Sequence, residues 1–279
     1  MIDSHIHVAP PELPGVGPLS PSLRGSTENV ARIVREQMHA GGCETTLAIG
    51  SLSAVEDDPL GVRRTLEIAA QVPGLHAIGI ANPERTDPEF LRRVEAELKQ
   101  RRVVALKVFL GYLHFAPCDP GYRAYYELAE RYDVPVLFHT GDTYSPFAKL
   151  KYAHPLGIDE VAVDHPKTHF ILAHVGNPWM ADAAEVIYKN MNVWADLSGL
   201  LVGQDGDFTE PDGTEAAQDV VQRLQAAWRY AERPNRFLYG SDWPLAPMRG
   251  YRDFISSAIP AEFHDMVFTE NAQRLFGLG

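Results

Sequence analysis

The sequence predicts an α/β protein built as a single (β/α)8 TIM barrel, and three observations support this fold class. The chain has 279 residues, a length close to the roughly 250 that such a barrel uses. Short apolar segments alternate with longer amphipathic segments from one end of the chain to the other. Eight apolar segments are present, and eight strand–helix units favour closure into a barrel over an open sheet.

The eight apolar segments have the character of buried parallel strands. Such strands are covered on both faces, so they form continuous apolar runs without strict alternation. The predicted strands are Ile2–Val8, Thr45–Gly50, Leu75–Ala81, Val103–Phe109, Val134–His139, His169–His174, Asn192–Leu197 and Arg236–Gly240. An open doubly wound sheet is less well supported, because no G-x-G-x-x-G motif follows the first strand.

Amphipathic helices are expected between the strands. The first begins near Ser26-Thr27-Glu28-Asn29, where a hydroxyl side chain precedes the helical pattern. Its inner face has the i, i+3, i+4, i+7, i+8 spacing of a helix, in Val30, Ile33, Val34, Gln37 and Met38. A later helix extends from about Gly121 to Tyr132. No linker or change in composition divides the sequence, so we expect residues 1–279 to form one domain.

Two irregular segments interrupt this alternation. Residues Pro10–Pro21 contain five prolines in twelve positions and directly follow the first strand. Residues Gly203–Thr214 are rich in glycine and aspartate and follow the seventh strand. In a barrel both loops lie on the C-terminal face, where they could cover part of a site. Either segment could equally be a plain surface excursion.

Charge and composition limit the classes of partner. The formal charge of −12 makes nucleic acid and anionic membranes poor partners, although a small anionic substrate is not excluded, since a bound cation dominates its own site. No apolar run reaches 18 residues, and polar Asp3 and Ser4 stand where a signal peptide would become apolar. Cys43 and Cys118 are expected to be buried, reduced thiols rather than a disulfide. A cytoplasmic protein that binds a small molecule is therefore expected.

His5 and His7 form the first chemical signal. Residues i and i+2 of a strand point to the same face, so both imidazoles would project into the barrel. There they can converge on one metal ion at about 2.0–2.1 Å. The alternative is a pair of hydrogen-bonded core histidines.

Polar residues also end four other apolar strands. They are Lys107, His139, His174 and Asp242. A buried charge or unpaired imidazole costs several kcal/mol unless it is paired or bound to a metal. Because a barrel brings the C-terminal ends of its strands to one rim, these residues predict a shared site with His5 and His7.

The same residues lie in motifs by which the chain resembles the amidohydrolase superfamily, and within it the branch called amidohydrolase 2. The motifs are Asp3-Ser-His-Ile-His7, Leu106-Lys-Val108, Phe138-His-Thr-Gly141, Ala173-His-Val-Gly-Asn-Pro178, Gly240-Ser-Asp-Trp-Pro244 and Glu270-Asn-Ala-Gln-Arg-Leu-Phe276. They span nearly the whole chain in the order of that family. The branch includes metal-dependent lactonases and decarboxylases, so the motifs identify a superfamily and not a substrate.

The resemblance implies roles for individual residues. His5, His7 and His139 are similar to the family's metal ligands. Asp242 is similar to the carboxylate that contacts the metal and takes a proton from the attacking water. His174 corresponds to a histidine that acts as acid or base in one-metal members and binds the second ion in two-metal members.

Lys107 departs from the decarboxylases of the branch, which lack this motif. In some two-metal hydrolases of the superfamily a lysine near this place is carboxylated and bridges both ions. The alternatives here are an ion pair with Asp3, which shares the inward face of the first strand, or an ammonium group that binds substrate.

Several residues beyond these are candidates for substrate binding. They are Tyr112, His114, Asp142, Tyr144 and Arg249, each of which could instead make an ordinary loop or rim contact. Asp196 and Ser198 are expected to hold the rim together.

The leading hypothesis for function is metal-dependent hydrolysis of a lactone, amide or ester. One or two zinc ions, or manganese, would serve as cofactor, with Asp242 and His174 as catalytic residues. The alternatives are non-oxidative decarboxylation of an unsaturated or aromatic acid and, less well supported, a barrel without catalysis. The resembling branch also makes a homodimer plausible.

Overall fold

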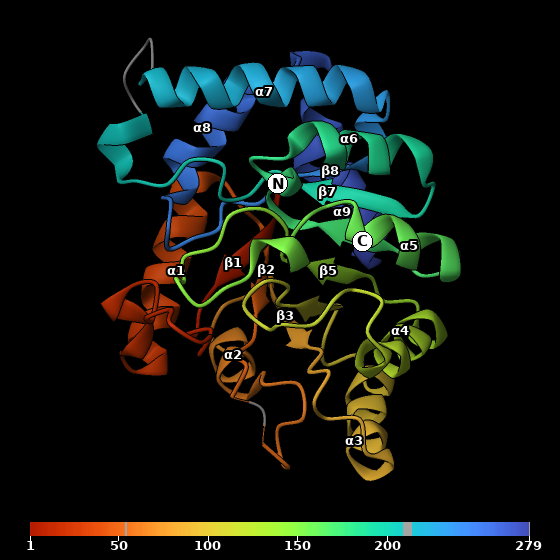
Figure 1. Cartoon of the computed structure of the whole chain (residues 1–279). Helices are drawn as coiled ribbons and strands as arrows, with labels where there is room; N and C mark the ends of the chain where they lie inside the picture. Colours follow the sequence, from red (N-terminus) through yellow and green to blue (C-terminus); the bar gives the residue numbers. More distant parts are fainter. Residues whose placement is uncertain (54, 209–213, 279) are drawn as a thin grey trace.

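The computed structural model describes residues 1–53, 55–208 and 214–278, which contain an eight-stranded parallel barrel surrounded by helices (Figure 1). The strands follow one another around the sheet in sequence order. They are β1 (Ile2–His7), β2 (Thr45–Ile49), β3 (Leu75–Ile80), β4 (Ala105–Val108), β5 (Val136–Phe138), β6 (Phe170–Leu172), β7 (Val193–Asp196) and β8 (Phe237–Leu238). The predicted (β/α)8 TIM barrel and all eight of its strands are confirmed, each strand being somewhat shorter than predicted.

Backbone hydrogen bonds join the two ends of the sheet. The amide of Ser4 donates to the carbonyl of Tyr239 at 2.9 Å, and the amide of His7 donates to the carbonyl of Trp243 at 2.7 Å. The amide of Asp242 donates to the carbonyl of His5 at 2.8 Å. These bonds fix the segment after β8 against β1, so Asp242 lies beside the two histidines of the first strand.

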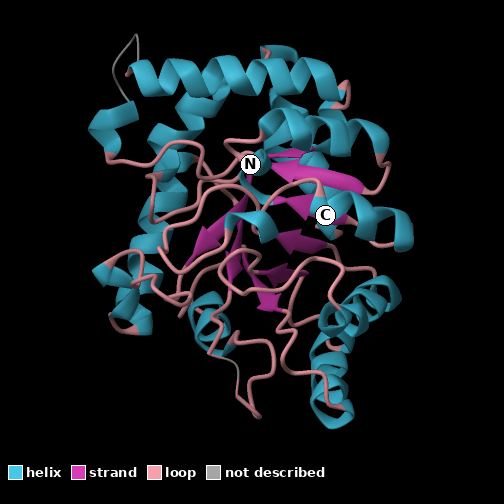
Figure 2. Cartoon of the chain, in the orientation of Figure 1, coloured by secondary structure: helices cyan, strands magenta, loops and turns pink. Residues whose placement is uncertain are grey.

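Helices lie outside the strands (Figure 2). They are α1 (Thr27–Gly41), α2 (Arg63–Ala69), α3 (Pro88–Lys99), α4 (Pro120–Tyr132), α5 (Gly157–Asp164), α6 (Met180–Lys189), α7 (Glu215–Ala231), α8 (Met248–Ala258) and α9 (Asn271–Phe276). The cap of α1 is the predicted one, since Ser26 accepts a hydrogen bond from the amide of Asn29. The predicted α4 ends at Tyr132, where Asp133 adopts a left-handed conformation with φ of 52°.

Alternation along the strands divides the apolar core into two parts and positions the polar residues. On β4, Leu106 and Val108 pack outward against the helices, whereas Ala105 and Phe109 belong to the core inside the barrel. Lys107 has the same parity as Ala105 and Phe109, so its side chain faces inward. Asp196 on β7 is likewise two residues after Trp194 of the inner core.

The two cysteines are both free thiols, as predicted. Cys43 is buried, but Cys118 is exposed in the loop before α4, so the expectation that both would be buried was wrong for Cys118. In the described part of the chain, no helix combines the length and the apolar character needed to cross a membrane.

The outer core provides a stability prediction that does not involve the site. Phe90 on α3 is fully buried between helix and sheet. Phe90→Ala should lower the free energy of unfolding by about 3–5 kcal/mol, because it removes apolar contacts and leaves a cavity. Val163→Ala on α5, where the side chain is 56% exposed, should change it by less than about 0.5 kcal/mol. Urea unfolding measures both, and equal effects would contradict the assigned packing.

Candidate active site

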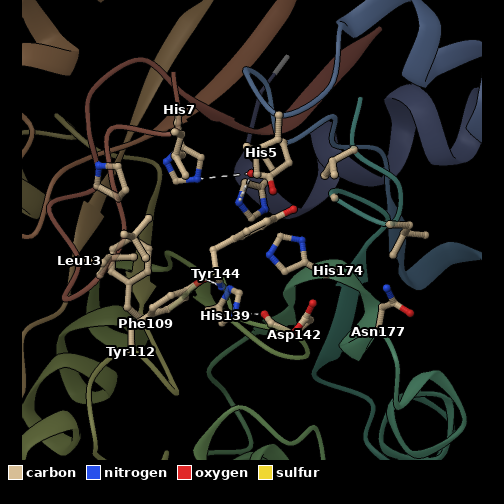
Figure 3. A pocket seen from close by; sticks show the side chains of 18 of the residues that line it. His5, His7, Leu13, Phe109, Tyr112, His139, Asp142, Tyr144, His174 and Asn177 are labelled. Carbon is tan, nitrogen blue, oxygen red and sulfur yellow. Dashed lines mark hydrogen bonds and ion pairs between the residues drawn. The ribbon is translucent and has the colours of Figure 1, made fainter. Parts of the chain in front are cut away.

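A cavity of about 270 Å³ opens at the C-terminal ends of the strands (Figure 3). Nine predicted site residues line it: His5, His7, Lys107, Tyr112, His139, Asp142, Tyr144, His174 and Asp242. They follow or end β1, β4, β5, β6 and β8, so the barrel brings together side chains that are as much as 237 positions apart in sequence.

Three ligand atoms face one another at the floor of this cavity. Asp242 Oδ1 lies 3.5 Å from His5 Nε2 and 3.4 Å from His7 Nε2. These separations are longer than ordinary hydrogen bonds, and Asp242 Oδ1 is buried without a hydrogen-bond partner. Two atoms that each lie about 2.0–2.1 Å from a tetrahedral ion are about 3.3–3.4 Å apart. The triangle therefore fits a divalent metal ion.

Hydrogen bonds orient the imidazole of His5 for this role. Its Nδ1 lies 2.8 Å from Asp196 Oδ2. Because an ionised carboxylate can only accept, Nδ1 carries the proton and donates it, which leaves the lone pair on Nε2. Histidine ligands are commonly held by a carboxylate in this way. Burial lowers the pKa of His5 to about 4, so the ring is neutral at pH 7 and can bind a metal.

The tautomers of His139 and His174 are fixed by the same reasoning. His139 Nε2 donates to the backbone carbonyl of Asp142 at 2.8 Å, and His174 Nδ1 donates to the backbone carbonyl of Ser198 at 3.0 Å. The other nitrogen of each ring is therefore the one that can carry a lone pair. The ring centroids of His139 and His174 are 5.1 Å apart, which places His139 beside the cluster, outside the close triangle.

Asp196 organises the cluster from behind. Its Oδ1 accepts hydrogen bonds from the amide of His174 at 2.9 Å, the amide of Ser198 at 3.1 Å and the hydroxyl of Ser198. Burial raises the pKa of this carboxyl, but the interactions with His5 outweigh burial, so the pKa is well below its ordinary value. Asp196 holds the rim as predicted, and its contact with His5 adds a positioning role that the sequence did not reveal.

Asp196, His5 and His174 also form a close group, but this group is a hydrogen-bond network. The 2.8 Å between His5 Nδ1 and Asp196 Oδ2 is a hydrogen-bond distance. It is shorter than the roughly 3.3 Å between neighbouring ligands of a tetrahedral ion. The metal position is therefore the triangle of His5, His7 and Asp242.

Lys107 is buried in the cavity and has its Nζ 5.5 Å from the ring centroid of Phe109. Burial lowers its pKa to about 8, although the charges of Asp196 and Asp242 act in the opposite direction. The predicted alternative of an ion pair with Asp3 was wrong. The described residues contain no such pair within 4.0 Å, and Asp3 Oδ1 accepts instead from the amides of His5 and Ser241.

Asp242 is ionised in this environment. Burial raises its pKa, but the interactions with His5, His7 and His174 outweigh this effect, so the pKa is well below the ordinary value. Its backbone has a φ of 60°, and that of His174 is 59°, both in the left-handed region that non-glycine residues rarely adopt. Such conformations persist where the surroundings hold a functional side chain in place.

The structure separates the five predicted substrate-binding residues into two groups. Tyr112, Asp142 and Tyr144 line the cavity, and the hydroxyl of Tyr112 accepts a hydrogen bond from the amide of Tyr144 at 3.0 Å. His114 does not line the cavity, because it is exposed and its Nε2 bonds to the carbonyl of Phe147 at 2.8 Å. Arg249 is also outside, since it is an exposed residue on the first turn of α8.

The two irregular loops differ in whether their residues line the cavity. The proline-rich segment after β1 does cover the site, because several of its side chains line the cavity. Of the segment 203–214, residues 209–213 lie outside the described residues, and its described part contributes no lining residue. Leu200, Leu201 and Val202, just before it, line the cavity instead.

Sequence reasoning also missed Gly199, which lines the cavity with a φ of 60°. A Cβ at this position would lie 2.8 Å from both Asp242 Oδ2 and His174 Nδ1. Only glycine leaves these two side chains undisturbed. A glycine three residues after the strand-ending Asp196 was the available signal.

Comparisons with known proteins agree with this architecture. The family model described as Amidohydrolase matches residues 2–278. The chain is similar to the structure of a probable 2-pyrone-4,6-dicarboxylic acid hydrolase from Acinetobacter baumannii with citric acid bound, at 15% identity and a TM-score of 0.67, with 99% of each chain covered. It is similar to an amidohydrolase from Burkholderia multivorans with bound zinc, at 18% identity and a TM-score of 0.68, with 100% of this chain and 99% of that chain covered.

A third similar structure is the 2,6-dihydroxybenzoate decarboxylase from Rhizobium, at 19% identity and a TM-score of 0.65, with 99% of this chain and 98% of that chain covered. At these identities the likeness shows the fold alone. No curated protein matches the chain. The structural neighbours therefore include both hydrolases and decarboxylases.

Asp196→Asn tests the positioning of His5. The amide keeps the shape of the side chain but removes the negative charge that holds the Nδ1 proton. Zinc affinity, measured by competition with a chromogenic chelator, should fall by about 10–100-fold. Asp164→Asn, the same change on the exposed surface of α5, should leave it unchanged. An Asp196→Asn protein that folds and binds zinc as tightly as the parent would show that Asp196 does not position a ligand.

Proposed function

The chain belongs to the amidohydrolase family, and on that premise we propose that it is a metal-dependent hydrolase that cleaves a lactone, amide or ester bond of a small molecule. The observation that carries this proposal is the buried triangle of His5 Nε2, His7 Nε2 and Asp242 Oδ1 at the floor of the cavity. A buried carboxylate oxygen without a hydrogen-bond partner, facing two imidazoles, is costly without a cation.

Zinc suits this set of donors best, and manganese is the second candidate, because imidazole nitrogen favours these ions over magnesium and calcium. When bound, the ion would lower the pKa of a water molecule from about 16 towards about 7 and polarise a substrate carbonyl.

Asp242 is the residue that we assign to proton transfer. Its Oδ2 lies close to Gly199, which lines the cavity, and its low pKa keeps the carboxylate ionised at neutral pH. The carboxylate can accept the proton of the attacking water and return it to the leaving group. The Nδ1 proton of His174 is held by the carbonyl of Ser198, so this nitrogen is not free to donate to a developing oxyanion. We therefore assign His174 to ligation or to acid–base transfer through Nε2.

Lys107 supports hydrolysis more specifically. Its pKa of about 8 leaves part of the side chain as the free amine near neutral pH, which is the form that adds carbon dioxide to give a carbamate and release a proton. A carboxylated Lys107, together with His139 and His174, would provide ligands for a second ion in the same cavity.

One observation favours a second candidate. Of the two close groups of ligand atoms among the described residues, one is joined by the His5–Asp196 hydrogen bond, and the other is the triangle, which is a site for one ion. A one-ion site with an unmodified Lys107 suits non-oxidative decarboxylation of an unsaturated or aromatic acid, in which the carbon that loses CO2 takes up a proton that comes from water and is relayed by His174 or Asp242. Assays that follow acid release and CO2 release separately distinguish the two reactions.

Asp242→Asn tests the assigned proton transfer. The variant should lose at least about a thousandfold in kcat, because an amide cannot accept the proton, yet it should keep much of its zinc. His5→Ala and His7→Ala should instead lower the zinc content itself. Elemental analysis beside turnover measures both effects. Full activity in Asp242→Asn would exclude this residue as the base.

Lys107→Met tests the two-ion site. If Lys107 is carboxylated, protein reconstituted with zinc and bicarbonate should bind two ions per chain, and the variant should bind one. Intact-protein mass spectrometry should also find the added mass of one CO2 in the parent and not in Lys107→Met. Lys167→Met, at a position that is 80% exposed, should match the parent. One ion in both parent and Lys107→Met would favour the decarboxylase.

A further inference from the structure

Above its polar floor, the cavity has an apolar wall formed by the proline-rich segment after β1. Four side chains of this segment line the cavity: Pro11, Leu13, Val16 and Leu19. Hydrogen bonds hold the segment in place, from Ser145 Oγ to the carbonyl of Pro14 at 2.7 Å and from the amide of Leu52 to the carbonyl of Pro11 at 3.0 Å. The wall is therefore preformed, and an apolar ligand does not have to order it.

Further apolar side chains come from other loops of the same face. Leu200, Leu201 and Val202 follow β7, Leu245 follows β8, and Phe109 and Tyr112 follow β4. Leu13, Phe109 and Tyr112 lie together on the His7 side of the cavity in Figure 3. A group attached to the reacting carbonyl would meet hydrocarbon on that side.

The polar side chains outside the floor lie on the other side of the cavity. Figure 3 shows Asp142 and Asn177 there, away from Leu13. Asp142 is acidic, and Asn177 Oδ1 already accepts from Arg223 Nη1 at 2.7 Å. The guanidinium of Arg223 also bonds to Asp219, so its charge is compensated.

Among the described residues that line the cavity, Lys107 is the one with a cationic side chain. It belongs to the floor, where Asp196 and Asp242 act on its charge. Arg249, which would have offered a guanidinium to a substrate carboxylate, is outside. A free carboxylate group on the substrate that was buried against this wall would thus lack a charged partner, which is strongly unfavourable.

We propose that the substrate carries an uncharged apolar group of several carbon atoms beside its hydrolysable carbonyl, and no free carboxylate group. This inference rests on the proposed hydrolase function and narrows its substrate class to alkyl- or aryl-substituted lactones, esters or amides. It separates this chain from the dicarboxylic acid hydrolase with which it shares a fold.

A pair of metal-binding ligands tests the proposal by affinity alone. Hexanohydroxamate and its ω-carboxylated counterpart share the same chelating head and chain and differ in the terminal group. Calorimetry on the zinc-loaded protein should give an affinity at least tenfold higher for hexanohydroxamate. Equal affinity, or tighter binding of the carboxylated ligand, would overturn the apolar assignment while leaving the metal site intact. Binding of neither would overturn the proposed function, and the inference with it.

Hydroxamates of different chain length, together with substitutions in the apolar wall, test where the apolar group binds. From acetohydroxamate to hexanohydroxamate, affinity should rise about three- to fourfold for each methylene that becomes buried. Leu13→Ala, and independently Val16→Ala, should flatten this dependence and leave acetohydroxamate unchanged. Leu150→Ala, in which a 47% exposed leucine outside the cavity lining is truncated, should keep the parental dependence. Parental dependence in both wall variants would show that the chain does not lie against this wall.

Discussion

The site depends on where the imidazole protons are. A carboxylate oxygen accepts from His5, and backbone carbonyls accept from His139 and His174, so each of these rings keeps its proton on the outer side of the cluster. The remaining nitrogen of each ring is the one that can offer its lone pair to a cation. Asp196 matters most here, because one buried carboxylate fixes the ring of His5, the backbone of His174 and Ser198. Without these acceptors, nothing would fix which nitrogen of each ring carries the proton.

Much of the fold could be predicted because the barrel repeats one local pattern. Each apolar strand is followed by a helix, so eight weak signals support one another, and the order of the strands follows from short connections. Strand ends were less certain, because β5, β6 and β8 pair over only two or three residues and then continue as loops that carry His139, His174 and Asp242. The exposure of Cys118 was not predicted, because it depends on how one loop meets α4 and not on any repeating pattern.

The site was predictable to the extent that strand parity determines it. Strand parity predicted that His5 and His7 face inward, and the C-terminal ends of apolar strands predicted Lys107, His139, His174 and Asp242. Positions on loops and helices followed no such rule. Arg249 is close to Asp242 in sequence, but it lies on the first turn of α8, where its side chain is exposed to solvent. His114 makes a hydrogen bond with the backbone carbonyl of Phe147 in a neighbouring loop. The apolar wall was also hidden, because a proline-rich segment gives no indication of which side chains turn inward. The proposed substrate preference therefore depends on residues whose placement only the structure provides.

X-ray absorption spectroscopy of the zinc-loaded protein tests the metal site at the level of its ligands. A zinc ion held by the triangle should show a first shell of nitrogen and oxygen at about 2.0–2.1 Å, with the outer-shell scattering of at least two imidazoles, and should lose one imidazole in His7→Ala. Zinc that is absent, or bound without imidazole scattering, would contradict the claim that His5, His7 and Asp242 hold a metal ion.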